Sequence, residues 1–264
     1  MLRLYGFGLN FNQAEHSGGN VYALDAYNGA KIWNYSLRSG VHSSPAVVDG
    51  TVFVGCRDNS VYALNALTGA KIWSFATGRE VDSSPAVVAG VVYVGSSDGN
   101  IYALNASTGN KVWSYATRGN VRSSPAVANG TVYIGSEGDD FYALNATTGA
   151  KLWSSPFGGA SSPAVSDGIV FRDISALNSS TGKLIWQKET FTVSKVRGAP
   201  SPIVADGILY TGTQGNGFLA LNASTGAQIW NRNDDAALFM TSSSPAVSSR
   251  ASRRLCSGPA PWTD

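Results

Sequence analysis

The side chains that could do chemistry are few and widely spaced in this sequence. Two histidines (His16, His42) and two cysteines (Cys56, Cys256) occur, and they lie apart in unrelated contexts. They form neither a disulfide framework nor the ligand set of a zinc site. No nucleophile, zinc-protease or phosphate-binding motif is present. The sequence therefore predicts no catalytic residue and no metal site.

Carboxylates fall mainly in expected turns and do not spell a calcium-binding loop, which needs six to eight converging oxygens. These turn residues are Asp58, Asp98, Glu137, Asp139, Asp140 and Asp173. We expect them to be solvated turn residues.

A first candidate binding surface consists of positions that change inside an otherwise repeated segment. The residue before Ser-Ser-Pro is His42, Asp82 and Arg122 in three successive copies, then Ala160. Loop residues that vary while the surrounding repeat stays the same are typical of a binding surface. Neutral drift at exposed positions is the competing explanation. We expect this ring of residues to lie near the mouth of a central channel.

A second candidate surface lies where the repeat lengthens. The step from tryptophan to the next proline is 12 residues in the first three copies, but 16 from Trp186 and 15 from Trp230. Charges beside an aromatic ring and a methionine can form an adaptable contact patch. The candidate binding residues in these longer segments are Lys195, Arg197, Asp234, Asp235, Phe239 and Met240.

An internal repeat defines all of these positions. SSPAV recurs at 43–47, 83–87, 123–127, 161–165 and 243–247, with PSPIV at 200–204. In the second copy we expect strands at 45–48, 51–55, 60–65 and 71–75, with Asp49-Gly50 forming a two-residue hairpin turn. Four short antiparallel strands per repeat of about 40 residues predict the blades of an all-β propeller.

Both faces of the expected strands are apolar, as they are when a sheet is covered on each side by a neighbour. One tryptophan ends each copy, and an indole fills a large volume between packed sheets. We therefore predict a structural role for Trp33, Trp73, Trp113, Trp153, Trp186 and Trp230.

The block ALNxxTGxxxW, carried for example by Ala63, Asn65, Gly69 and Trp73, resembles the pyrroloquinoline-quinone (PQQ) repeat family of β-propellers. The family includes quinoprotein dehydrogenases and outer-membrane assembly lipoproteins of the BamB type. If the chain is one of the dehydrogenases, the resemblance implies that it binds PQQ together with Ca²⁺ and uses an aspartate as a base. Many of these enzymes also have a disulfide between adjacent cysteines. This sequence has no adjacent cysteines.

We accordingly favour a non-catalytic scaffold for protein–protein interaction, without a cofactor. The first alternative is a PQQ-dependent dehydrogenase with Ca²⁺. The second is a propeller that binds a small ligand or carbohydrate.

Six tryptophan-ended units favour six blades, in which an innermost strand at 245–247 completes the first blade and closes the ring. The alternative is a truncated propeller of seven or eight blades, which is commoner in the family. Residues 1–248 are expected to form one domain, and 249–264 a tail outside the repeat.

Composition limits the partners. The net charge of +2 does not favour nucleic acid, and no apolar run reaches the ~20 residues that span a bilayer. We expect another protein as partner and a monomeric chain. No clear signal peptide is seen at the N-terminus, while the family resemblance implies an extracytoplasmic location.

Overall fold

The computed structural model describes residues 5–10, 18–138, 140–156, 158–188, 201–212 and 217–233. Within these ranges every regular element is a strand, and no helix is long and apolar enough to cross a membrane. Six antiparallel sheets follow one another in chain order, five with four strands and the first with three. We call them the first to sixth blades. This architecture confirms the all-β propeller.

The strands occupy four equivalent positions, from the centre of the molecule to its rim. The innermost strands are β4 (Ala46–Val48), β8 (Ala86–Val88), β12 (Ala126–Ala128), β16 (Ala164–Ser166) and β20 (Ile203–Ala205). The second strands are β1 (Tyr5–Asn10), β5 (Thr51–Cys56), β9 (Val91–Gly95), β13 (Thr131–Gly135), β17 (Ile169–Arg172) and β21 (Ile208–Gly212). The third strands are β2 (Asn20–Asp25), β6 (Ser60–Asn65), β10 (Asn100–Asn105), β14 (Phe141–Asn145), β18 (Ser175–Asn178) and β22 (Gly217–Asn222). The outer strands are β3 (Lys31–Ser36), β7 (Lys71–Ala76), β11 (Lys111–Ala116), β15 (Lys151–Ser155), β19 (Leu184–Gln187) and β23 (Gln228–Asn233).

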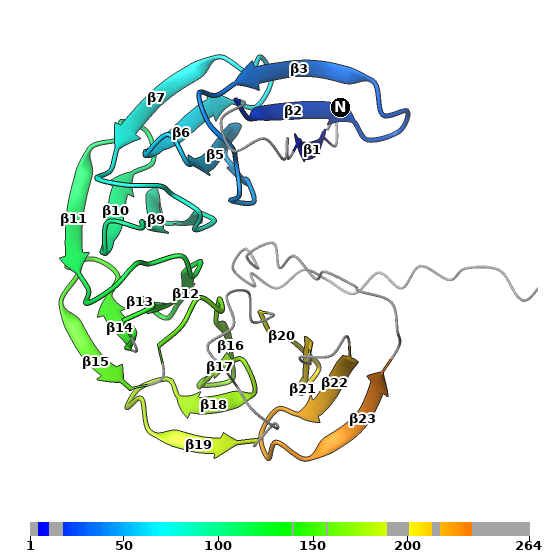
Figure 1. The fold of residues 1–264 in the computed structure, drawn as a ribbon, viewed down its shortest axis with the longest axis vertical. Coiled ribbons are helices and arrows are strands. Elements are labelled where there is room, and N and C mark those ends of the chain that lie inside the picture. Colours follow the sequence, from blue (N-terminus) through cyan, green and yellow to red (C-terminus); the bar gives the residue numbers. More distant parts are fainter. Residues whose placement is uncertain are drawn as a thin grey trace, which may run out of the picture.

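The blades form an arc around a common centre, with the outer strands along the rim and β3 and β23 at its two ends (Figure 1). The first blade contains β1–β3 and lacks an innermost strand among the described residues, as the sequence predicts. The strand predicted at 245–247 to complete it lies outside the described residues.

Turn chemistry explains why each repeat folds into hairpins. Asp49 and Gly50 have φ angles of 48° and 73°, the left-handed pair that a two-residue hairpin turn requires. In the next turn, the side-chain Oδ1 of Asn65 accepts hydrogen bonds from the backbone N–H groups of Leu67 (2.9 Å) and Thr68 (3.0 Å). These local bonds fix the direction in which the outer strand returns.

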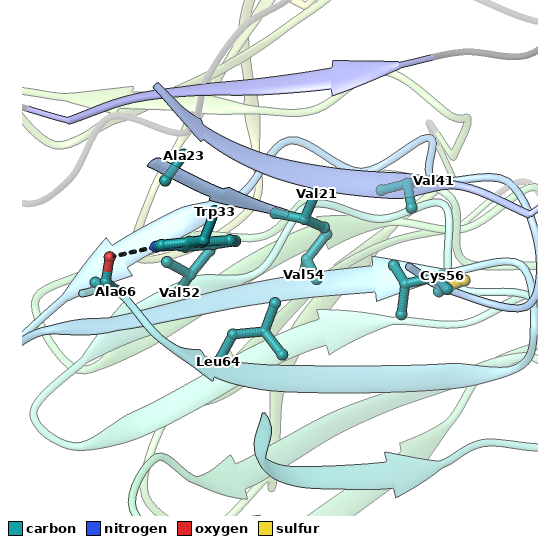
Figure 2. Packing of buried hydrophobic residues seen from close by; sticks show 10 residues of the cluster. Val21, Ala23, Trp33, Val41, Val52, Val54, Cys56, Leu64 and Ala66 are labelled. Carbon is teal, nitrogen blue, oxygen red and sulfur yellow. Dashed lines mark hydrogen bonds between the residues drawn. The ribbon is translucent and has the colours of Figure 1, made fainter. Parts of the chain in front are cut away.

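The first five of the six repeat tryptophans each dock their blade onto the next one. The Trp33 indole Nε1–H donates to the carbonyl of Ala66 at 2.9 Å, and the ring lies where a Cβ on Gly69 would fall 2.7 Å away. Figure 2 shows this contact with Val52 and Leu64 beneath it. The same bond joins four later pairs at 2.8–2.9 Å: Trp73–Ala106, Trp113–Ala146, Trp153–Ser179 and Trp186–Ala223.

The two serines of the SSPAV segment have separate tasks. The first serine binds its own blade, since the Ser43 hydroxyl accepts from the backbone N–H of Gly55 at 2.7 Å. The second serine binds the neighbouring blade, since the Ser84 hydroxyl accepts from the backbone N–H of Ser44 at 2.8 Å. The second-serine bond recurs along the series Ser84–Ser124–Ser162–Ser201 at 2.9–3.1 Å. The starts of five innermost strands are thereby linked into one chain of hydrogen bonds.

Candidate functional site

The loops that join successive blades share one face of the arc with the turns between second and third strands. In the loop 77–85, the backbone N–H of Gly78 donates to the Asp98 side chain at 2.7 Å, and the Glu80 carbonyl accepts from Ser97. Both partners belong to the turn of the third blade. The sequence-based placement of the residues before Ser-Ser-Pro on this face agrees with these contacts.

Four charged side chains form a continuous row across this face, and we call them the charged row: Arg57, Asp82, Arg122 and Glu137. Arg57 holds Asp82 through two hydrogen bonds, Nε to Oδ1 at 2.8 Å and NH2 to Oδ2 at 3.1 Å. Arg122 lies between the two acids, 3.6 Å from Asp82 Oδ2 and 3.1 Å from Glu137 Oε1. The row spans the second, third and fourth blades and alternates in sign.

The row combines order with accessibility. The Asp82 side chain is only 12% exposed, whereas Arg57 is 40% exposed and Arg122 and Glu137 are near 30%. Asn120 donates to the second Glu137 oxygen at 3.3 Å. The Nε of Arg122 is buried and makes no hydrogen bond in the described part of the chain, but it lies 3.6 Å from Oδ2 of Asp82, within ion-pair distance.

His42 lies beside this row and responds to its charges. Partial desolvation of the imidazole lowers the pKa of His42 below its ordinary value, the Arg57 guanidinium lowers it further, and Asp82 opposes both. The neutral imidazole is therefore favoured at neutral pH. Of the three residues predicted before Ser-Ser-Pro, Asp82 and Arg122 are in direct contact and His42 is electrostatically coupled to them.

Arg57 is the residue that sequence reasoning missed. It occupies the turn position that holds Ser97 and Glu137 in the next two copies, at intervals of 40 residues. The presence of a basic residue where the other two copies have a neutral or an acidic one was the signal in the sequence that could have identified Arg57 as a candidate. Its partner could not be identified in advance, because the two residues are 25 positions apart in loops of different repeats.

The acidic turn residues mostly have structural partners. The Tyr62 and Tyr102 hydroxyls donate to Asp58 and Asp98, each at 2.7 Å, and the Tyr142 hydroxyl donates to Asp140 at 3.0 Å. Burial first, and then the neighbouring carboxylate, raises the pKa of Tyr142 to about 12. Asp173 pairs with the buried Arg172 at 2.7 Å, and Asp139 lies outside the described residues.

No three histidine, cysteine or carboxylate side chains converge among the described residues. The Cys56 thiol is buried and donates to backbone carbonyls of Ser39 and Gly40, and burial raises its pKa to about 12.

The second candidate surface cannot be described in the same way. Its six residues, Lys195, Arg197, Asp234, Asp235, Phe239 and Met240, lie outside the described residues. Its role stays a prediction from the sequence.

The docked tryptophans and repeated hairpins define the class of protein: a β-propeller assembled from PQQ-like repeats. A family model described as "Outer membrane protein assembly factor BamB" matches residues 14–171 and 159–256, and the chain belongs to this family. A comparison with curated proteins gives no match.

Solved structures share the fold. BamB from Moraxella catarrhalis is 24% identical with a TM-score of 0.71, over 84% of this chain and 72% of that one. The computationally designed Ika8 protein is 16% identical with a TM-score of 0.70, over 86% and 73%. A europium-containing methanol dehydrogenase is 14% identical with a TM-score of 0.71, over 88% and 69%. The same architecture thus occurs in an assembly factor, a designed protein and an enzyme.

Proposed function

We propose that this chain is a non-catalytic scaffold that binds another protein through the face carrying the charged row. The observation that supports this is the row itself: four side chains of alternating charge, held by one another across three blades. Ordered side chains lose little rotamer freedom when a partner binds. Alternating charge favours a partner with the complementary sequence of charges and disfavours others.

The family supports the choice of partner. Its description names outer membrane protein assembly. We propose a protein of that assembly process as partner, an extracytoplasmic location, and a monomeric propeller formed by residues 1–248. No nucleic-acid or membrane-inserted role is proposed.

Site-specific photo-cross-linking in cells tests this function. A photoreactive residue at Arg118, whose side chain is 82% exposed and pairs with Asp140 on the same face, should cross-link an outer-membrane assembly protein. The matched control is Leu67, which is 63% exposed. It lies in the turn that follows β6, at the end of this strand away from the face with the charged row. Asp82→Arg should abolish the Arg118 adduct because it repels both arginines of the row. Equal adducts from both positions, or an adduct that survives Asp82→Arg, would contradict the proposal.

The longer segments are proposed as a second part of the contact. Phe239→Ala and Arg197→Glu should each weaken binding by ~2 kcal/mol or more if they are anchors. Arg79→Glu, in the loop that also carries Asp82, should weaken binding as well, because it lies on the proposed contact face. Lys71→Glu, at the exposed start of β7, is the control outside that face, and loss of binding in this control would contradict the proposed contact.

The enzymatic alternative has its own test. The chain is incubated with PQQ and Ca²⁺, and a bound-quinone absorption band and dye-linked oxidation of alcohols or aldoses are measured. A bound band with turnover would replace the scaffold proposal.

A further inference from the structure

The face with the charged row carries further arginines and acids around the row. We call one part of this face the contact sector, and it consists of the loops 37–45, 77–85 and 117–125 and the turns 57–59, 96–99 and 136–140. Its described arginines are Arg38, Arg57, Arg79, Arg118 and Arg122. Its described acids are Asp58, Glu80, Asp82, Asp98, Glu137 and Asp140. The formal charges nearly cancel, so the sector has little long-range attraction for a polyanion.

The two signs of charge lie at different depths in the contact sector. The side chains of Arg57, Arg79 and Arg118 are 40%, 61% and 82% exposed, and Arg38 is also exposed. The acids are all half-buried, and those with an arginine partner have side chains that are only 12–38% exposed. Arg122 alone among the arginines lies as deep as the acids. A molecule that approaches the sector therefore meets guanidinium groups first.

The acids point inward because groups of the fold itself donate hydrogen bonds to them. The Asp98 carboxylate accepts from the Gly78 backbone N–H and from the Tyr102 hydroxyl, both at 2.7 Å. Asp58 and Asp140 accept from tyrosine hydroxyls of their own blades in the same way. These carboxylates hold the turns and loops together and are already bonded within the chain.

Three of the arginines have no close anion. We call Arg38, Arg79 and Arg118 the outer arginines, since each follows the end of an outer strand by two or three residues. The Nε of Arg79 is 3.6 Å from Glu80, and the Nε of Arg118 is 3.8 Å from Asp140. No ion pair involves Arg38 in the described part of the chain. Exposed pairs at such distances contribute little to stability, so these guanidinium groups can bind another anion at little cost.

The use of arginine rather than lysine indicates the kind of anion. In the first four blades and their loops, every described arginine lies in the contact sector, and the described lysines begin outer strands: Lys31, Lys71, Lys111 and Lys151. Lysine at a strand edge discourages pairing with another chain. Only arginine has a planar fork that binds a carboxylate through two parallel hydrogen bonds. Arg57 binds Asp82 in this way within the chain itself.

We propose, resting on the proposed function that places a protein partner on this face, that the outer arginines bind carboxylates of an acidic segment of that partner. A protein segment is favoured over an anionic membrane or a nucleic acid. The reason is that Glu80, Glu137 and Asp140 lie among the arginines and would repel a uniform layer of negative charge. A peptide can place separate carboxylates opposite the arginines alone.

A phage-displayed library of random peptides, selected on the full chain, is the probe. The retained peptides should be enriched in aspartate and glutamate relative to the unselected library. Their affinity, measured by fluorescence anisotropy, should fall about tenfold or more when Arg38→Gln, Arg79→Gln and Arg118→Gln are combined. The matched control combines Lys31→Gln, Lys71→Gln and Lys111→Gln. It removes the same charge from exposed positions outside the face and should change the affinity by less than about twofold.

A second variant separates the planar fork from simple charge. Arg38→Lys, Arg79→Lys and Arg118→Lys together keep the three positive charges, and the peptides should still bind more weakly than to the parent chain. Affinity equal to that of the parent chain would contradict recognition by the guanidinium fork.

Two further results would overturn the proposal. The first is that the chain retains no acidic peptides, or that the lysine-to-glutamine control loses as much affinity as the arginine variant. The second is that the chain sediments with phosphatidylglycerol vesicles and the arginine-to-glutamine variant does not, which would assign the outer arginines to a membrane. Failure of the proposed function is told apart by the photo-cross-linking at Arg118. An adduct with an assembly protein, without retention of acidic peptides, removes the acidic contact and leaves the proposed function standing.

Discussion

At the scale of the residue, tryptophan is required because the inter-blade contact needs size and a donor at once. The indole covers a glycine and donates its N–H to a backbone carbonyl of the next blade. Phenylalanine would supply part of the volume but no donor.

Trp113→Ala should therefore lower the free energy of unfolding by ~3–5 kcal/mol, because it leaves a cavity between the third and fourth blades and removes one of the two hydrogen bonds that the Ala146 carbonyl accepts, the other coming from the Tyr93 hydroxyl. The measurement is chemical denaturation. Val112→Ala, next to it but 51% exposed, should cost no more than ~0.5 kcal/mol. Equal stability of Trp113→Ala and the parent protein would refute the docking role.

Asp98 gives a prediction for acid stability. Burial alone would raise its pKa, but hydrogen bonds from Tyr102, Gly78 and Asn100 lower it below the ordinary value. A carboxyl with a depressed folded-state pKa stabilises the fold fully above its unfolded pKa of about 3.9, and this stability is lost as pH falls through the lower folded value. In Asp98→Asn, the free energy of unfolding should therefore decrease less than in the parent protein as the pH is lowered through this range. An unchanged acid limb of the pH–stability curve would contradict this.

At the scale of the element, each innermost hairpin depends on one left-handed residue before its glycine. Four turns use residues that tolerate this conformation, and these are Asp49, Asn129, Asp167 and Asp206. The third blade has Ala89 there, with φ of 49°. Alanine lacks the polar side chain that eases this conformation.

Ala89→Asn should stabilise the protein by about 0.5–1 kcal/mol, since it relieves the left-handed strain without touching the core. Thermal unfolding measures it, and Asn129→Ala at the equivalent turn should lower the midpoint by a similar amount. A drop in the midpoint for Ala89→Asn would show that strain does not limit this hairpin.

The predicted closing strand can be tested by register. Ala46 pairs with Phe53 in the second blade, so Ala246 should pair with Phe7 in the first. Paired positions lie ~4.5–5.5 Å apart between Cα atoms, a separation that a disulfide spans. Ala246→Cys with Phe7→Cys, in a Cys256→Ser background, should oxidise to a cross-link seen by peptide mapping. Ala246→Cys with Asn10→Cys, three residues along the strand, should not. Cross-linking of both pairs, or of neither, would refute the pairing.

At the scale of the whole molecule, repetition made most of the fold predictable from the sequence. Turns, strands and docking depend on contacts within a repeat or between copies at a constant interval, as with Trp73 and Ala106. The charged row was only half predictable, because Arg57 and Asp82 meet through loops that the repeat pattern treats as variable. The exposure of Trp230 was not predictable either, since its motif matches those of buried tryptophans.

The sameness of the docking contact also bears on descent. Each blade presents a glycine platform to one neighbour and an indole to the other, so any blade fits any other. Recombination that removes residues 83–122 would join Asp82 to Ser123 and let Trp73 meet Ala146 and Gly149. Every remaining contact between an indole and a glycine platform would keep its partner types. Blade number can therefore change in whole units by unequal exchange between gene segments, while selection on each contact holds the blade itself constant.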